Sequence, residues 1–150
     1  TQDGLTLYKG VEAIGTYRLS DDLKLGAGAV YLDPSIRNVS AGNEDLRGNA
    51  PEWAAKWQIT GNAEYQIPAM PGLTLHGNIR YTGKAPISDS NTLFVPAYTT
   101  ANAGFQFDTL VGGRKVTFIG NLNNLLNAKY WTQTNIGEGI NAAMSVRLSW

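Results

Sequence analysis

The fold is decided by the last eleven residues, which read Ile140-Asn141-Ala142-Ala143-Met144-Ser145-Val146-Arg147-Leu148-Ser149-Trp150. Every even-numbered residue in this stretch is apolar, and every odd-numbered residue except Ala143 is polar. Because successive side chains of a β-strand point to opposite faces, this alternation predicts a strand with one apolar and one polar face. The strand ends on Trp150, an aromatic residue of the type that is enriched where a membrane meets water.

The same two-residue period recurs in six segments upstream of this ending. The clearest is residues 53–67, whose apolar odd-numbered positions are Trp53, Ala55, Trp57, Ile59, Ala63, Tyr65 and Ile67. The other segments are residues 5–19, 22–33, 72–83, 97–108 and 114–123. We therefore expect an all-β chain of about seven long antiparallel strands, with the odd-numbered residues of 53–67 on a single face.

The connections between the expected strands alternate between short and long. Residues 20–21, 68–71 and 109–113 are short and rich in turn-forming residues. The long, polar connections are residues 34–52, 84–96 and 124–139. In outer-membrane β-barrels the short turns lie at the periplasmic rim and the long loops at the extracellular rim. The sequence therefore predicts an up-and-down meander in the wall of such a barrel.

Aromatic residues are expected near both ends of these strands. Next to the long connections they are Tyr31, Trp53, Tyr81 and Trp131, and next to the short turns they are Tyr17, Tyr65, Phe107 and Trp150. Two belts separated by one membrane thickness are typical of a membrane barrel. A soluble β-sandwich is the alternative, but its outer face is usually richer in charge and its strands are shorter, about 5–6 residues.

Composition excludes several classes of function. The 12 basic and 12 acidic residues balance, so charge gives no argument for binding nucleic acid. Cysteine is absent, which removes disulfides, thiolate metal sites and thiol nucleophiles, and His76 is the single histidine. No nucleophile stands beside a paired base and no phosphate-binding loop is present, so we expect no enzyme, no cofactor and no metal site.

Seven short motifs extend along almost the whole chain. They are Gly10-Val11-Glu12, Tyr31-Leu32-Asp33, Pro51-Glu52-Trp53, Pro71-Gly72-Leu73, Arg80-Tyr81-Thr82-Gly83, Pro96-Ala97-Tyr98 and Asn121-Leu122-Asn123-Asn124-Leu125-Leu126-Asn127-Ala128-Lys129-Tyr130-Trp131. In this order and spacing the chain resembles the TonB-dependent outer-membrane receptors, and within them the ferric-siderophore branch. The last motif is the most specific, although Leu126 and Asn127 stand where the family more often has Phe and Asp.

The resemblance implies that residues 1–150 are the C-terminal third of a 22-stranded barrel, whose N-terminal strands and plug domain would lie outside this segment. It implies a Gram-negative outer-membrane receptor that takes up ferric siderophores in an energy-dependent way. The implied partners are the ferric siderophore, the TonB complex, outer-membrane lipid and the barrel-assembly machinery. A passive channel or small eight-stranded barrel, and a soluble β-sandwich binding module, are the alternatives.

Candidate ligand-binding residues are sought in the long connections, because loops carry recognition. Ferric siderophores are bulky and often anionic, so aromatic faces and cationic donors suit them. Residues of these types are Arg37, Arg47, Lys84, Phe94, Tyr130 and Trp131. We expect His76 to be a hydrogen-bonded residue of the polar face, Lys56 to lie on that face, and Lys9 to reach lipid headgroups from the apolar face. Trp150 is the expected assembly signal.

Overall fold

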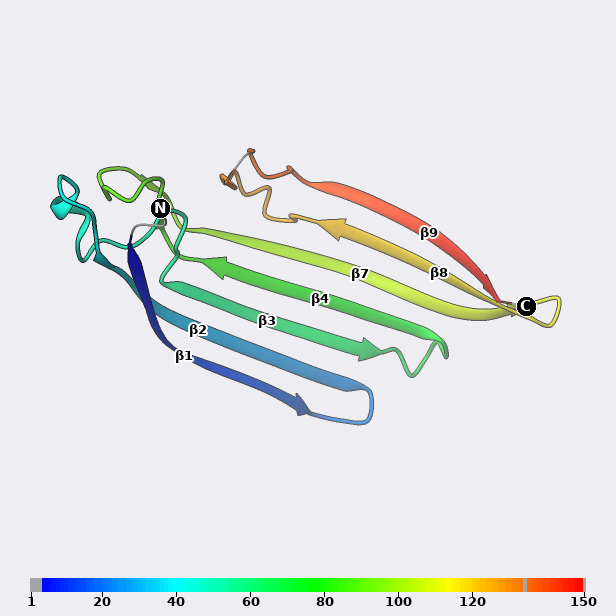
Figure 1. The fold of residues 1–150 in the computed structure, drawn as a ribbon. Helices are drawn as coiled ribbons and strands as arrows, with labels where there is room; N and C mark the ends of the chain where they lie inside the picture. The colour runs from blue at the N-terminus through cyan, green and yellow to red at the C-terminus, as the bar shows by residue number, and fades with distance from the viewer. Residues whose placement is uncertain (1–3, 134, 150) are drawn as a thin grey trace.

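The computed structural model describes residues 4–133 and 135–149, which form one seven-stranded antiparallel sheet (Figure 1). Its strands are β1 (Leu5–Arg18), β2 (Leu23–Asn38), β3 (Trp57–Gln66), β4 (Leu73–Thr82), β7 (Tyr98–Val111), β8 (Arg114–Asn123) and β9 (Asn141–Ser149). Each strand pairs with the next one of the sheet along the chain, which confirms the expected up-and-down meander. Two short strands, β5 (Ala85–Pro86) and β6 (Phe94–Val95), pair with each other, and η1 (Glu44–Leu46) is a single 3-10 turn.

The register of pairing places apolar residues from all seven strands on one face, called the apolar face below. Ile59 of β3, for example, pairs with Ala29 of β2 and with Tyr81 of β4. One row across six strands consists of Leu25, Ala63, Gly77, Ala103, Leu122 and Ala142. The opposite, polar face carries the row Asn62, Asn78 and Asn102. The alternation read from the sequence therefore describes the two faces of a real sheet.

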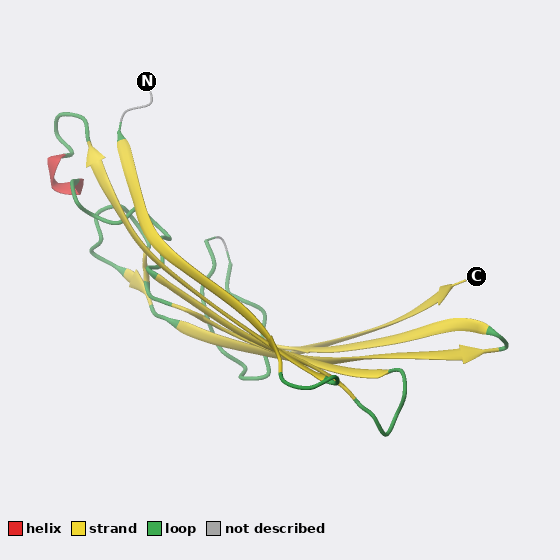
Figure 2. Ribbon diagram, turned by 90° about the horizontal axis from the view of Figure 1, so that it is seen from below, coloured by secondary structure: helices red, strands yellow, loops and turns green. Residues whose placement is uncertain are grey.

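Both faces of the sheet are open in this structure. Most large apolar-face side chains remain exposed, among them Leu25 at 37% and Met144 at 79%, whereas Val116 is 6% exposed. Figure 2 shows a single bent layer, and the described residues form no second sheet of comparable size against it. A β-sandwich buries its apolar side chains between two facing sheets, so this arrangement contradicts the sandwich alternative.

The two ends of the sheet differ in their connections (Figure 1). One end, called the short-turn rim, has the turns 19–22, 67–72 and 112–113. At the last of these, Gly112 and Gly113 have φ of 58° and 79° between the paired residues Val111 and Arg114. Two residues at positive φ form the tight hairpin turn that matches the twist of a sheet. Because β7 continues to Val111, this turn is shorter than the 109–113 expected from the sequence.

The other end, called the long-connection rim, has the first (39–56), second (83–97) and third (124–140) long connections. Two boundaries differ here from the sequence prediction. β2 continues to Asn38, which pairs with Leu5, so Arg37 lies in a strand and not in a loop. β3 begins only at Trp57, because Trp53 has a left-handed φ of 61°. The prediction that the odd-numbered residues of 53–67 lie on a single face is therefore confirmed for 57–65 and wrong for Trp53 and Ala55, which precede the strand.

Candidate functional site

Amide and imidazole side chains line the middle of the polar face. Asn102 Nδ2 donates a hydrogen bond to Asn78 Oδ1 at 2.9 Å between β7 and β4. His76 Nε2 lies 3.1 Å from Asn121 Oδ1, and Gly104 of β7 stands between them in the register. A Cβ at Gly104 would lie 2.5 Å from His76 Nε2, so the absence of a side chain there lets the two groups meet. The expectation that His76 is a hydrogen-bonded residue of this face is confirmed.

Asn91 joins the first and second long connections at the other end of the sheet. Its Nδ2 donates to the carbonyl of Ala50 at 2.7 Å, and its Oδ1 accepts from the N–H of Ala50 at 3.1 Å. Asn91 has φ of 54°, a left-handed conformation that Asn tolerates better than most residues. Asn49 Nδ2 adds a bond of 2.9 Å to the carbonyl of Asp89. These contacts hold the two connections together as one unit.

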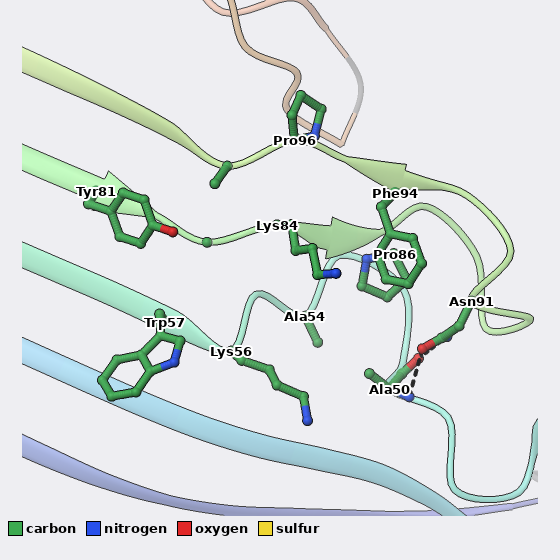
Figure 3. A pocket seen from close by; sticks show the side chains of 12 residues that line it. Ala50, Ala54, Lys56, Trp57, Tyr81, Lys84, Pro86, Asn91, Phe94 and Pro96 are labelled. Atoms are coloured by element: carbon green, nitrogen blue, oxygen red, sulfur yellow. Dashed lines mark hydrogen bonds between the residues drawn. The ribbon is translucent and has the colours of Figure 1, made fainter.

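A cavity of about 660 Å³, called the rim cavity, lies between this unit and the ends of β3 and β4 (Figure 3). Its aromatic lining consists of Trp57, Tyr81 and Phe94, and its cations are Lys56 and Lys84. Trp57 and Tyr81 belong to the apolar face, because each is in register with apolar-face residues of the neighbouring strand. The rim cavity therefore lies on the apolar side of the sheet.

Two lysines of the rim cavity have different surroundings. Lys84 Nζ lies 5.1 Å from the centroid of the Phe94 ring, within the range of a cation–π contact. Lys56 Nζ forms an ion pair of 2.7 Å with Asp33 Oδ1, and this hydrogen bond raises the pKa of Lys56 above its usual value. Lys56 was expected on the polar face, but it precedes β3 and its side chain turns toward Asp33 instead. That expectation was wrong because residue 56 lies outside the alternating strand.

Further cations surround the same carboxylate. Lys9 lies directly opposite Asp33 in the pairing of β1 with β2. Both Lys9 and Arg37 interact electrostatically with Asp33. Lys9, Arg37 and Lys56 therefore surround one acidic residue at the long-connection rim, and Lys84 lies apart from them over Phe94.

The third long connection is organised by Asn124, which is 4% exposed and has φ of 51°. Its Nδ2 donates to the carbonyls of Ala128 at 2.9 Å and Glu138 at 2.8 Å. Its Oδ1 accepts from the N–H of Ala128 at 2.9 Å, and its own N–H donates to Asn102 Oδ1 at 2.8 Å. The most specific motif of the sequence is thus a structural one, which closes the turn after β8 and ties the connection to the polar face.

Two aromatic candidates in this connection have different roles. Tyr130 stacks on Tyr98 with the ring centroids 4.4 Å apart, and a Cβ at Gly137 would collide with the Tyr130 ring. Tyr130 is therefore a packing residue. Trp131 forms an isolated bridge with Ile136, and 56% of its surface is exposed. Its indole is available to a ligand at the rim.

The structure brings four of the six candidate residues together in pairs: Lys84 and Phe94 line the rim cavity, and Tyr130 and Trp131 line a cavity of about 740 Å³ in the third long connection. Arg37 lies in β2, and Arg47 follows η1, where its charge acts on Glu44. The hydrogen bonds of Glu44 with its own backbone and with the N–H of Gly42 contribute more than Arg47 to a lowered pKa of that carboxyl. Trp150 lies outside the described residues, so its role as an assembly signal stays a prediction.

Sequence reasoning missed Lys56, Trp57 and Tyr81 as lining residues of a cavity. It assigned all three to the wall, where alternation explained them. A lysine directly before an aromatic residue at the start of a strand was the available signal, because this pair marks the level where a strand leaves the membrane.

Two kinds of feature are absent from residues 4–133 and 135–149. These residues hold no group of three or more His, Asp or Glu side chains that could bind a metal ion. They also form no helix that is long and apolar enough to cross a membrane.

Comparison with known proteins connects this geometry to a family. The family model described as TonB dependent receptor-like, beta-barrel, matches residues 4–125. The ferrioxamine receptor of Yersinia enterocolitica is 33% identical over 125 residues, which cover 81% of this chain and 17% of that receptor. The ferrichrome receptor FcuA of the same organism is 29% identical over 108 residues, covering 72% of this chain and 14% of the receptor. The chain therefore spans less than a fifth of these two relatives.

A solved structure shows the same arrangement of strands. BauA, the ferric preacinetobactin receptor from Acinetobacter baumannii, superimposes with a TM-score of 0.87 and 30% sequence identity. The match covers 99% of this chain and 23% of the BauA chain. The siderophore receptor PiuA from the same organism shares the fold with a TM-score of 0.79 at 23% identity, covering 95% of this chain and 22% of that chain.

Proposed function

Because the chain belongs to the family of TonB-dependent receptor β-barrels, we propose that it forms part of an outer-membrane receptor for energy-dependent uptake of ferric siderophores. The observation that carries the proposal is the segregation of the sheet into one polar and one apolar face over seven strands. A wall with these faces separates lipid from an aqueous lumen, as the barrels of outer-membrane transporters do. The receptors that the chain resembles are named for ferrioxamine, ferrichrome and ferric preacinetobactin.

The proposal includes further strands that close the barrel and a plug domain in its lumen. Among the described strands of the sheet, β1 and β9 each have one hydrogen-bonded neighbour. Their outer edges therefore carry backbone groups that would lack partners in lipid, where each unpaired group costs several kcal/mol. A closed wall removes this cost. Residues 1–150 are then one segment of the barrel domain, and coupling to the TonB complex is assigned to other parts of the protein.

Within this segment, Arg47 and Trp131 are the proposed siderophore contacts. Both lie in long connections at the rim, and both are exposed. A guanidinium and an indole offer a charge and a flat face to a bulky anionic complex. Tyr130 is excluded because it packs on Tyr98, and Lys84 and Phe94 are excluded because they line a cavity on the apolar side.

Uptake of radioactive iron tests the proposal in a strain that produces the full-length protein and no other siderophore receptor. Ferric ferrioxamine and ferrichrome are the two complexes to supply. We expect accumulation of iron from at least one of them, and its loss when the proton gradient is collapsed. Accumulation that persists without the gradient would contradict the proposal and would favour a passive channel.

A further inference from the structure

The rim cavity lies where a membrane-spanning wall meets the headgroups of the outer leaflet. Its lining residue Trp57 is in ring contact with Tyr31 of β2, with centroids 4.8 Å apart. Aromatic residues on the lipid-facing side of a barrel mark the boundary between hydrocarbon and headgroups. Below Trp57, the next side chain on the same face is Ile59, which is 45% exposed. The cavity is therefore continuous with the apolar wall.

The charges beside the rim cavity favour an anionic occupant. Lys56 and Lys84 line it, and Lys9 and Arg37 lie around Asp33. Within the described part of the chain, Lys84 Nζ has no carboxylate oxygen within 4 Å. A group that neutralises these cations adds an electrostatic contribution at a surface where water is partly excluded.

We propose that the rim cavity binds a phosphorylated lipid of the outer leaflet. Its phosphate would lie between Lys56 and Lys84, and an acyl chain would extend over Trp57 and Ile59. A soluble anion would leave the apolar floor of the cavity in contact with water, and a purely apolar chain would leave Lys84 without a counter-ion. An amphiphile satisfies both requirements. The inference depends on the outer-membrane position of the wall and not on the uptake of siderophores.

Binding of lipid A to the purified full-length protein tests the proposal. The probe is lipid A with two phosphates in nonionic detergent, compared with a phosphate-free glycolipid of matched acyl chains. We expect the variant Lys56→Gln/Lys84→Gln to bind lipid A about 25-fold more weakly than the wild type, since each lysine near a lipid surface contributes about fivefold. The phosphate-free glycolipid should bind both proteins equally weakly.

Two control variants separate charge from folding. Lys129→Gln removes an exposed lysine of the third long connection, away from the rim cavity, and should bind lipid A as the wild type does. Lys56→Arg/Lys84→Arg keeps both charges and should retain binding within a few-fold. Loss of binding in either control would overturn the proposal.

Three other outcomes would also decide against a lipid site. Equal binding of lipid A by the wild type and the double Gln variant would refute it. Displacement of lipid A by millimolar inorganic phosphate would indicate a site for soluble anions. Loss of iron uptake with unchanged lipid binding in the double Gln variant would assign the lysines to the siderophore path. Lipid binding as expected in a protein that takes up no siderophore would support this inference and refute the proposed function.

Discussion

The two rims of the sheet are held together by different kinds of interaction. At the short-turn rim two turns depend on glycines at positive φ, Gly72, Gly112 and Gly113, and in the turn 19–22 Ser20 Oγ accepts from the N–H groups of Asp22 and Leu23. At the long-connection rim the side-chain amides of Asn91 and Asn124 bind backbone groups that are distant in the sequence. The difference shows that one rim is fixed by local chemistry, whereas the other depends on individual side chains that a mutation can remove.

This contrast also separates structural from functional surface. A tight turn leaves few side chains free to bind anything, while connections of this length present many. The rim cavity and the exposed Trp131 both lie at the long-connection rim. The scaffold that positions them consists of the seven hydrogen-bonded strands of the sheet.

The largest effect is expected from Gly72→Ala at the short-turn rim. Gly72 has φ of 91°, and a Cβ there would lie 2.2 Å from the carbonyl oxygen of Asp108. Backbone strain and this collision together should cost about 3 kcal/mol or more. We expect much less folded, heat-modifiable protein in outer-membrane fractions. Gly15→Ala is the matched control, because a Cβ at Gly15 meets nothing within 4 Å and should change little. Similar losses in both variants would show that the turn is not the cause.

The next largest effect is expected from Asn124→Ala at the long-connection rim. It removes three side-chain hydrogen bonds and leaves partly buried backbone groups of Ala128 and Glu138 without these partners, at about 1 kcal/mol for each lost bond. Limited proteolysis should cleave the third long connection faster than in the wild type. Asn127 also has a positive φ, of 46°, but among the described residues its side chain accepts one long hydrogen bond of 3.4 Å, from the N–H of Ile140. Asn127→Ala should therefore accelerate proteolysis less than Asn124→Ala. Equal acceleration in the two variants would mean that backbone strain, and not the hydrogen bonds, causes the effect.

A smaller effect is expected from Asn91→Ala, because Asn91 is only half-buried. Loss of its contacts with Ala50 should cost about 1 kcal/mol and stay local. Hydrogen exchange of the Ala50 N–H, measured by mass spectrometry of the surrounding peptide, should become faster. Asn91→Gly relieves the positive φ and still lacks the amide. Exchange that returns to the wild-type rate in the glycine variant would refute the role of the hydrogen bonds.

The smallest effect is expected from the ion pair between Lys56 and Asp33, whose side chains are 50% and 55% exposed. Solvent screens such pairs, so Lys56→Met should hardly change stability. The measurement is the temperature at which the band of folded, heat-modifiable protein disappears on a gel, which should stay almost unchanged. Because the pKa of Lys56 is raised from 10.5, any stabilisation that the charge of Lys56 gives the pair is fully present from neutral pH up to 10.5 and is lost as the pH rises through the higher value. If Lys56→Met lost as much stability at neutral pH as Asn91→Ala does, this assignment would be contradicted.

The part of the fold that alternation and turn chemistry control could be predicted from the sequence. The faces of residues 57–65 and the turn at Gly112 and Gly113 follow from local rules. The start of β3 could not be predicted, because Trp53 leaves the alternating pattern by donating its N–H to the carbonyl of Pro86 at 2.7 Å. That bond depends on how two long connections meet in space. The rim cavity was missed for the same reason, since both connections build it.

The central claim is that the two faces of this sheet contact different solvents in the membrane, and cysteine labelling along β3 tests it most directly. The chain has no cysteine, so single cysteines can be introduced in a cysteine-free full-length protein in outer-membrane vesicles. We predict that a water-soluble maleimide labels cysteines at Gln58, Thr60, Asn62 and Glu64. Cysteines at Ile59, Ala63 and Tyr65 should stay unlabelled until the membrane is dissolved. Equal labelling of both sets in the intact membrane would contradict the claim.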